Sequence, residues 1–367
     1  MQQIPHKLAA PAAALGFLVL ASPTLAAPPG VAVTDVALSR TSFNPSQGED
    51  VEISYRLAAA DRVWLRVYDP DEGLVRVLVN GEKRAAGPHR ERWDGKDLEG
   101  RVVPDEAYLF TIETASGSFY DPTTSSGGVV GDLTAAKFDR TAGTVSYQLP
   151  AAARVLIRLG LHNGPMLKTL VDWKPRPEGS VTERWDGRDE NDLVDLRGRP
   201  GFNTLITYVT LPDATVIAFG NESSAYRDYK LGPAKNRPRK PERKATPELQ
   251  ARLRPEGLVP PAWARAPRVS MTFPQAGDAK IPAVKKEVAV RVDVDPADRD
   301  YLFKDQFEVI FFVDNVFFAE AERGHLPFNW KWELQQFPPG EHILTVNVSS
   351  FKGQVGVASR KVQIITE

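Results

Sequence analysis

The chain has 367 residues, 30 of them proline, no cysteine and a formal net charge of −1 at pH 7. The lack of cysteine excludes disulfides, thiolate metal sites, a cysteine nucleophile and a lipoprotein anchor. The near-zero net charge excludes global electrostatic attraction to nucleic acid or membrane. The length allows two to four domains of roughly 100 to 150 residues, and the proline content favours turns and linkers over long helices.

The first 26 residues have the pattern of a secretory signal peptide. His6 and Lys7 precede an apolar run from Leu8 to Leu20, and small residues precede an expected cleavage site after Ala26. The alternative is a membrane anchor, but the run is shorter than the roughly 20 residues that span a bilayer and contains Pro11. We therefore expect a periplasmic, extracellular or cell-surface protein with no membrane span after signal removal.

A seven-residue string occurs twice in the first half of the chain. Residues 91–97 read Glu-Arg-Trp-Asp-Gly-Lys-Asp and residues 183–189 read Glu-Arg-Trp-Asp-Gly-Arg-Asp, at an offset of 92 (185 − 93 = 92). The match extends in register to residues 53–67 and 145–159, which contain apolar residues at every second position, as in half-buried strands. Because this spacing holds a whole small β-sandwich, the sequence predicts two related antiparallel sandwiches.

The first copy resembles the FlgD Ig-like repeat family. The resemblance rests on Phe43-Asn44-Pro45, Trp93 to Asp97, Gly100, Val103-Pro104 and Tyr108, in this order. It implies one immunoglobulin-like domain over residues 27–120 and a second over residues 132–221. Glu106 stands where the family usually has glycine, which implies a wider hairpin. The chain lacks the hook-assembly segment of the flagellar hook-capping protein and carries a secretory signal, so a flagellar role is not implied.

The second copy departs from the family pattern after Asp189. An acidic extension replaces the short return of the first copy, and we expect last strands at Leu205 to Leu211 and Val216 to Phe219. The extension suggests a calcium site, because side-chain oxygens are the ligands that calcium prefers. The candidate ligands are Asp186, Asp189, Asn191, Asp192 and Asp195. Their spacing does not fit an EF-hand loop, and the first copy offers only Asp97 and Glu99 in the same loop.

The Trp-Asp-Gly string also has a purely structural interpretation. The indole would close the sandwich core at a strand end, and the two aspartates of each copy would accept backbone N–H bonds in a tight turn. Gly95 and Gly187 would permit positive φ in that turn. In this interpretation the string is required by the fold, and chemistry is expected only in the second loop.

Residues 222–267 form a basic, proline-rich segment without apolar alternation. We expect a solvated, semi-rigid spacer with a short helix that begins near Thr246 and Pro247. The alternative is a basic patch that binds an anionic surface, such as lipopolysaccharide, an acidic polysaccharide or an acidic protein. Nucleic acid is not expected, since only Trp263 is near for base stacking.

Residues 268–367 contain a third set of alternating apolar segments. A turn at Asp314-Asn315, followed by Trp330 and a Pro-Gly-Glu-His string at 339–342, resembles bacterial Ig-like domains. The adjacent pairs 311–312 and 317–318 are all phenylalanine, and one member of each pair must reach a second surface. An apolar binding patch is therefore a hypothesis for Phe312, Phe317, Phe318 and Trp330.

No catalytic motif is present, and the four histidines after His6 are scattered over the three modules. The sequence predicts an all-β protein of three tandem immunoglobulin-like sandwiches joined by linkers, non-enzymatic and without a cofactor apart from the calcium hypothesis. We expect a scaffold, spacer or accessory subunit of a periplasmic or cell-surface assembly, with an envelope or extracellular protein partner. The alternative is a polysaccharide-binding or adhesion module that uses the aromatics of the last domain and the basic linker.

Overall fold

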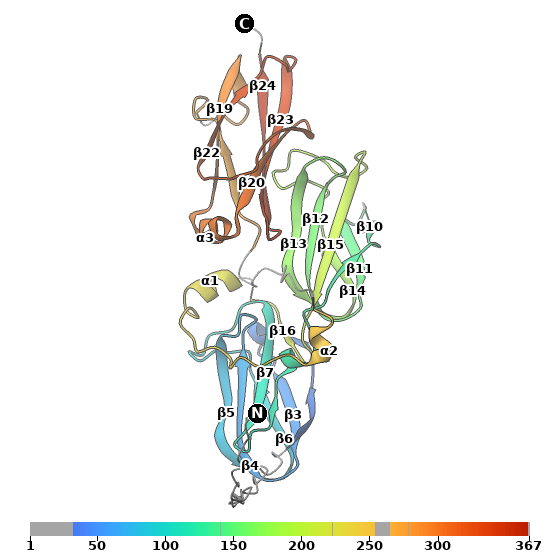
Figure 1. The fold of residues 1–367 in the computed structure, drawn as a ribbon. Helices are drawn as coiled ribbons and strands as arrows, with labels where there is room; N and C mark the ends of the chain where they lie inside the picture. The colour runs from blue at the N-terminus through green and yellow to red at the C-terminus, as the bar shows by residue number, and fades with distance from the viewer. Residues whose placement is uncertain (1–31, 140, 222, 254–264, 278, 366–367) are drawn as a thin grey trace, which may run out of the picture.

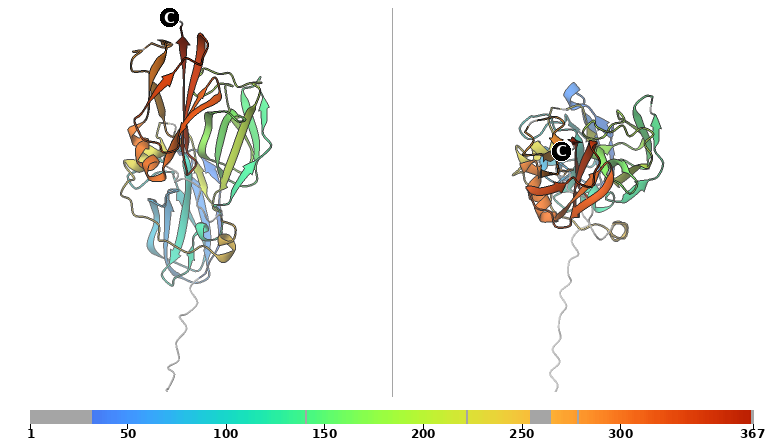
Figure 2. Two further views of the ribbon diagram at one scale, coloured as in Figure 1. Left: turned by 45° about the horizontal axis from the view of Figure 1, so that its top comes forward. Right: turned by 90° about the horizontal axis from the view of Figure 1, so that it is seen from above.

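The computed structural model describes residues 32–139, 141–221, 223–253, 265–277 and 279–365. The expected signal peptide at residues 1–26 lies outside these ranges. The described residues form β-strands arranged in six sheets, with only short helices between them (Figure 1). The predicted all-β class is confirmed, and the sheets pack in pairs around three apolar cores. Figure 2 shows the same arrangement from two further sides.

The first sandwich contains one three-stranded and one larger sheet. The smaller sheet has the order β1 (Val33–Leu38), β3 (Val51–Leu57) and β6 (Gly87–Trp93). The larger has the order β2 (Ser42–Phe43), β16 (Val216–Ala218), β7 (Glu106–Thr114), β4 (Asp61–Tyr68) and β5 (Leu74–Arg84), and β8 (Phe119–Tyr120) also pairs with β7. Two 3₁₀ turns, Pro45–Gln47 and Pro122–Thr124, follow Asn44 and Asp121 caps.

Strand β16 does not lie in the second sandwich, where the sequence predicted it as a last strand. It runs antiparallel to β7 and parallel to β2, both of which belong to the first sandwich. Val216 and Ala218 are buried in the first core, which explains why the chain returns there. The first sandwich is therefore completed by a strand that follows the second sandwich in the sequence.

Four strands of the second sandwich, β11 to β14, repeat β3 to β6 of the first at the offset of 92. One sheet has the order β10 (Lys137–Asp139), β11 (Thr144–Leu149) and β14 (Gly179–Arg184). The other has the order β13 (Met166–Arg176), β12 (Ala153–Leu161), β15 (Phe202–Thr210) and β9 (Val130–Leu133). Ile53 pairs with Glu91 and Val145 pairs with Glu183, so β3–β6 and β11–β14 share one register.

The third sandwich has sheets of three and five strands. The first has the order β17 (Val269–Thr272), β19 (Glu287–Val294) and β22 (Phe328–Glu333). The second has the order β18 (Ala283–Val284), β24 (Val355–Ile364), β23 (Gly340–Ser350), β20 (Phe307–Val313) and β21 (Val316–Ala321). Helix α3 (Pro296–Asp305) joins β19 to β20, and its N-cap is Asp295.

The basic segment after β16 packs against the first sandwich, in contrast to the expected solvated spacer. It contains α1 (Tyr226–Leu231) and α2 (Pro247–Gln250), which the predicted Thr246 caps. We call its residues 226–243 the basic strap. Leu74 donates its backbone N–H to Pro238 O at 2.8 Å, and Lys240 donates to Glu72 O at 2.7 Å. The strap therefore pairs with the start of the edge strand β5.

Among the residues that the structure describes, no helix combines the length and the apolar character needed to cross a membrane.

Candidate interaction sites at the two Trp-Asp-Gly turns

The two Trp-Asp-Gly turns are built from the same hydrogen bonds. The buried indole of Trp93 donates Nε1–H to Lys96 O at 3.0 Å, and Trp185 donates to Arg188 O at 3.0 Å. An exposed aspartate follows each indole, and Asp94 accepts the N–H of Lys96 as Asp186 accepts that of Arg188. Each turn therefore closes its own core at a strand end, as the structural interpretation predicts.

The last aspartate of each string organises the loop that follows. Asp97 Oδ1 accepts the backbone N–H groups of Glu99 and Arg101 at 3.0 and 2.9 Å. Asp189 Oδ1 accepts those of Leu193 and Val194, both at 2.7 Å. Both aspartates are fully buried. A buried carboxylate is stable there because backbone N–H groups replace part of its hydration.

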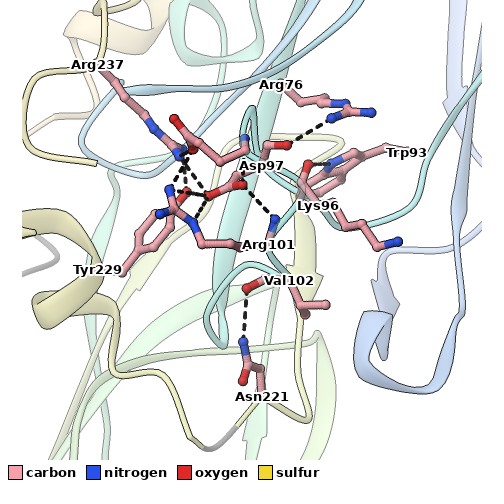
Figure 3. Close-up of polar contacts among 10 residues, drawn as sticks. Arg76, Trp93, Lys96, Asp97, Arg101, Val102, Asn221, Tyr229 and Arg237 are labelled. Atoms are coloured by element: carbon pink, nitrogen blue, oxygen red, sulfur yellow. Dashed lines mark hydrogen bonds and ion pairs between the residues drawn. The ribbon is translucent and has the colours of Figure 1, made fainter. Parts of the chain in front are cut away.

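The two turns differ at the other carboxylate oxygen. Asp97 Oδ2 accepts Arg237 Nη2 from the strap at 2.7 Å, Arg101 Nε at 3.1 Å and Tyr229 Oη at 3.2 Å (Figure 3). Burial opposes ionisation of Asp97, but the bonds from Arg237 and Arg101 outweigh it and lower its pKa. Asp189 Oδ2 is buried and has no hydrogen-bond partner within the described ranges.

Strand β16 also ends at the first turn. Asn221, three residues after the strand, donates its side-chain amide to the carbonyl of Val102 (Figure 3) and to that of Val103, both at 3.1 Å. Its own backbone N–H is bonded to Asp105 Oδ1 at 2.6 Å. The first turn is thus held by two later parts of the chain, the segment that follows β16 and the basic strap.

Further ion pairs fix the strap to the first sandwich. Lys230 Nζ lies 2.8 Å from Asp69, and Lys240 Nζ lies 2.6 Å from Asp121, with both carboxylates buried. Arg227 in α1 instead pairs with Asp298, the buried residue near the start of α3 in the third sandwich. The strap therefore connects the first and third sandwiches, and these cations are already neutralised within the chain.

The acidic residues of the second loop, which were the calcium candidates, mostly have other partners. Asp195 pairs with Arg197 at 2.7 Å, and these hydrogen bonds lower the pKa of Asp195. Asn191 Oδ1 accepts the N–H of Ser359 from the third sandwich at 2.6 Å, and the carbonyl of Asp192 accepts Arg188 Nη1 at 3.0 Å. In the part of the chain that is described, no three acidic or histidine side chains gather to hold a metal. Calcium binding stays a hypothesis without support from this geometry.

A buried ion pair joins the first and second sandwiches. Glu106 on β7 accepts Arg154 Nη2 at 2.6 Å and Nη1 at 3.2 Å, and Nη1 also donates to Trp173 O at 3.1 Å. Both side chains are at most 9% exposed. Sequence reasoning noted Glu106 as a departure from the family pattern but missed its partner, because Arg154 belongs to the next repeat.

The third sandwich contacts the second through the outer face of its five-stranded sheet. Asn347 accepts the N–H of Met166 at 2.9 Å and donates to its carbonyl at 2.8 Å. Phe312 pairs in register with Thr345, which lies two residues before Asn347 and so on the same face of β23. Phe312 is buried. The second surface that Phe312 was predicted to reach is therefore the face that carries this contact.

The other predicted aromatic residues separate into core and surface positions. Phe318 and Trp330 pack against the third core, with ring centroids 5.7 Å apart. Phe317 is 51% exposed on the edge strand β21 and contacts Phe312 edge-on at 6.2 Å. The structure therefore does not bring the four rings together on one surface, and only Phe317 presents a large exposed area.

The family match falls on the first sandwich. Residues 41–118 match the FlgD Ig-like domain. Over 58 residues, which are 16% of this chain, it is 41% identical to the basal-body rod modification protein FlgD of Salmonella typhimurium and of Salmonella typhi. The chain thus spans about a quarter, 25%, of the length of these curated relatives. The first sandwich is FlgD-like and Ig-like, as the resemblance implied.

Two solved structures also align with the chain. An endo-beta-1,4-mannanase from Thermotoga petrophila aligns over 28% of this chain and 20% of that chain, at 22% identity and a TM-score of 0.22. A tetra-tandem repeat from the extending region of a large adhesion protein aligns over 91% and 74%, at 12% identity and a TM-score of 0.18. At such TM-scores these alignments carry no argument about function.

Proposed function

We propose that this protein is a non-enzymatic, exported scaffold or accessory subunit that holds protein partners in a periplasmic or cell-surface assembly. In this proposal the second and third sandwiches are immunoglobulin-like domains beside the FlgD-like first domain. The match to FlgD supports a role in an assembly, since the relatives are named for the basal-body rod. A place near a flagellar rod or hook is the specific form of the same proposal.

The observation that carries the proposal is the buried ion-pair network between the sandwiches. Glu106 and Arg154 join the first to the second, and Arg227 and Asp298 join the strap to the third. Breaking one partner of a buried pair costs about 3–5 kcal/mol, so these contacts resist independent domain movement. A spacer that must hold partners at a fixed distance needs this property, whereas a flexible tether does not.

The experiment combines the shape of the chain with partner capture. Small-angle scattering of the mature chain should give one compact, elongated particle, and the double variant Arg154→Ala/Arg227→Ala should give a larger maximum dimension. Affinity purification of the native chain from the cell envelope should recover a stoichiometric protein partner, and the double variant should recover less of it. Absence of any stoichiometric partner, with a hydrolase activity detected in the purified chain, would contradict the proposal.

A further inference from the structure

The outer face of the second sandwich carries a cavity of about 240 Å³. We call this cavity the outer groove. Its floor is the sheet of β12, β15 and β9, and one wall is the turn at residues 351–353 of the third sandwich. The side chains that matter for its chemistry are Arg158, Trp173, Leu205, Thr207 and Phe351.

Comparison of the two copies shows that Arg158 lacks the carboxylate partner of its equivalent in the first sandwich. In the first sandwich Arg66, which lies 92 residues earlier, pairs with Glu113 at 3.2 Å. Strand pairing places Glu113 opposite Trp64, and the equivalent residue opposite Leu156 is Thr207. A threonine cannot neutralise a guanidinium. The cation of the second sandwich therefore faces a neutral residue where the first has an acid.

Among the residues that the structure describes, no other acid forms an ion pair with Arg158. Within the described ranges Arg158 makes no ion pair; its Nη2 donates to the carbonyl of Gly353, and its Nε is buried without a hydrogen-bond partner. Burial lowers the pKa of Arg158, and the more distant charge of Asp172 offsets this only in part. Of the other charged groups that line the groove, Asp132 accepts the Thr207 hydroxyl at 2.7 Å and Lys352 adds a second cation.

The apolar wall of the outer groove contains a strained tryptophan. Trp173 has φ +48°, a conformation that favours glycine, and the equivalent position of the first sandwich is Gly81 with φ +70°. A Cβ at Gly81 would lie 3.0 Å from the Trp64 ring, whereas the second sandwich has the smaller Leu156 in place of Trp64. Strained non-glycine residues concentrate at functional sites.

Two more side chains extend this wall toward solvent. Phe351 is 61% exposed and Leu205 is 47% exposed, and both line the outer groove beside Trp173. The strand β9 that borders them is an edge strand, since it pairs with β15 alone among the described strands. Its outward backbone groups are therefore open to an added extended segment.

We propose that the outer groove binds an acidic, extended segment of a protein partner, with a carboxylate on Arg158 and an adjacent apolar side chain against Trp173, Leu205 and Phe351. The first sandwich makes a comparable contact within the chain, but there the sandwich supplies the acid and the added segment supplies the cation. There Arg243 of the basic strap stacks on Phe119 at 3.9 Å and bonds Glu113 at 3.2 Å. The inference rests on the proposed scaffold function and names the chemistry of its partner.

The test uses phage-displayed random dodecapeptides selected against the full mature chain. We expect selected peptides to carry Asp or Glu beside an apolar residue. Binding of a fluorescein-labelled selected peptide, followed by anisotropy, should weaken at least tenfold in Thr207→Glu, because the new carboxylate supplies the missing partner of Arg158. Phe351→Ala, at an exposed position that folding tolerates, should weaken it several-fold. Phe303→Ala, at a 52% exposed position on α3 outside the groove, is the matched control and should bind as the parent chain does.

Three results would overturn the inference. The first is that no peptide is selected, and the second is that binding is the same in Thr207→Glu and Phe351→Ala as in the parent chain. The third is that polygalacturonate, an acidic polysaccharide, binds through Arg158 while peptides do not. An envelope partner that still binds Phe351→Ala and Thr207→Glu would remove the groove from the proposal and leave the scaffold function intact.

Discussion

The two Trp-Asp-Gly repeats share their internal hydrogen bonds but differ in what later parts of the chain place on them. The first turn receives Arg237 and Tyr229 from the basic strap at Asp97. Among the described residues no side chain bonds the second carboxylate oxygen of Asp189, and the loop of the second turn instead contacts the third sandwich through Asn191. The repeated module thus provides one framework, and the partner of each copy is set by residues outside the matched string.

The same edge of the module is used in both copies. Leu74, the first residue of β5, donates its N–H to the strap, and Met166, the first residue of β13 and 92 positions later, donates its N–H to Asn347. An edge strand offers unpaired backbone groups that another segment can complete. We infer that the start of this strand is the module's general docking position, occupied within the chain in both copies.

Removing either indole should have the largest effect. Trp93→Ala and Trp185→Ala each leave a cavity beneath a strand end, and each should lower the free energy of unfolding by about 3–5 kcal/mol. Trp93 is the more buried of the two and contacts Phe43 and Tyr108, so its replacement should cost more. Urea unfolding followed by circular dichroism measures both. Equal, sub-1 kcal/mol losses, below the range expected of buried positions, would show that neither turn closes a core.

The strap contact distinguishes the copies more directly. Arg237→Met leaves buried Asp97 with fewer donors and should destabilise the chain by about 2 kcal/mol, since hydrogen bonds to charged groups carry about 1.5–3 kcal/mol. The matched control is Arg197→Met in the second loop, which removes a solvent-exposed pair with Asp195 and should cost clearly less than Arg237→Met. A loss at Arg197 as large as that at Arg237 would contradict the assignment of the strap to the first turn alone.

Acid should release the strap from the first turn. The folded pKa of Asp97 is lowered, so its ionisation stabilises the fold above the unfolded aspartate pKa of about 3.9, and this contribution is lost as pH falls through the lower, folded value. We expect the amide protection factors of residues 226–243, which compare each exchange rate with its intrinsic value at the same pH, to fall below about pH 4. In Arg237→Gln this fall should be smaller, because the bond that lowers the Asp97 pKa is weaker and less stability depends on its ionisation. Protection factors independent of pH in the parent chain would argue against this linkage.

The sequence predicted the parts of the fold that depend on local pattern. Alternation in residues 53–57 and 145–149 and the 92-residue offset located the matching strands of both sandwiches, and the string itself indicated the turns. Thr246 and Pro247 correctly marked the start of α2. These features depend on side chains close together in the chain, where period and turn chemistry carry the information.

The long-range contacts were not accessible to the same reasoning. The charges of the basic segment predicted a solvated spacer. The carboxylates that neutralise Lys230, Arg237 and Lys240 lie more than a hundred residues away in the sequence, so their pairing could not be seen there. Strand β16 is too short to show which sheet it joins. Two signals were present, Glu106 in place of the family's glycine and Trp173 in place of Gly81, and both mark contacts made between or beside the sandwiches.

The smallest difference between the copies concerns the cation beneath each turn. Arg76 Nη1 donates to Asp97 O at 2.9 Å, and the residue 92 positions later, Lys168, approaches Asp189 O at 3.4 Å. The longer contact is weaker, so Arg76→Met should cost about 1 kcal/mol and Lys168→Met about half of that or less. Thermal unfolding monitored by calorimetry resolves the pair. A greater loss for Lys168→Met would mean that the uncovered second turn depends on this lysine, and that Asp189 is neutralised from within its own module.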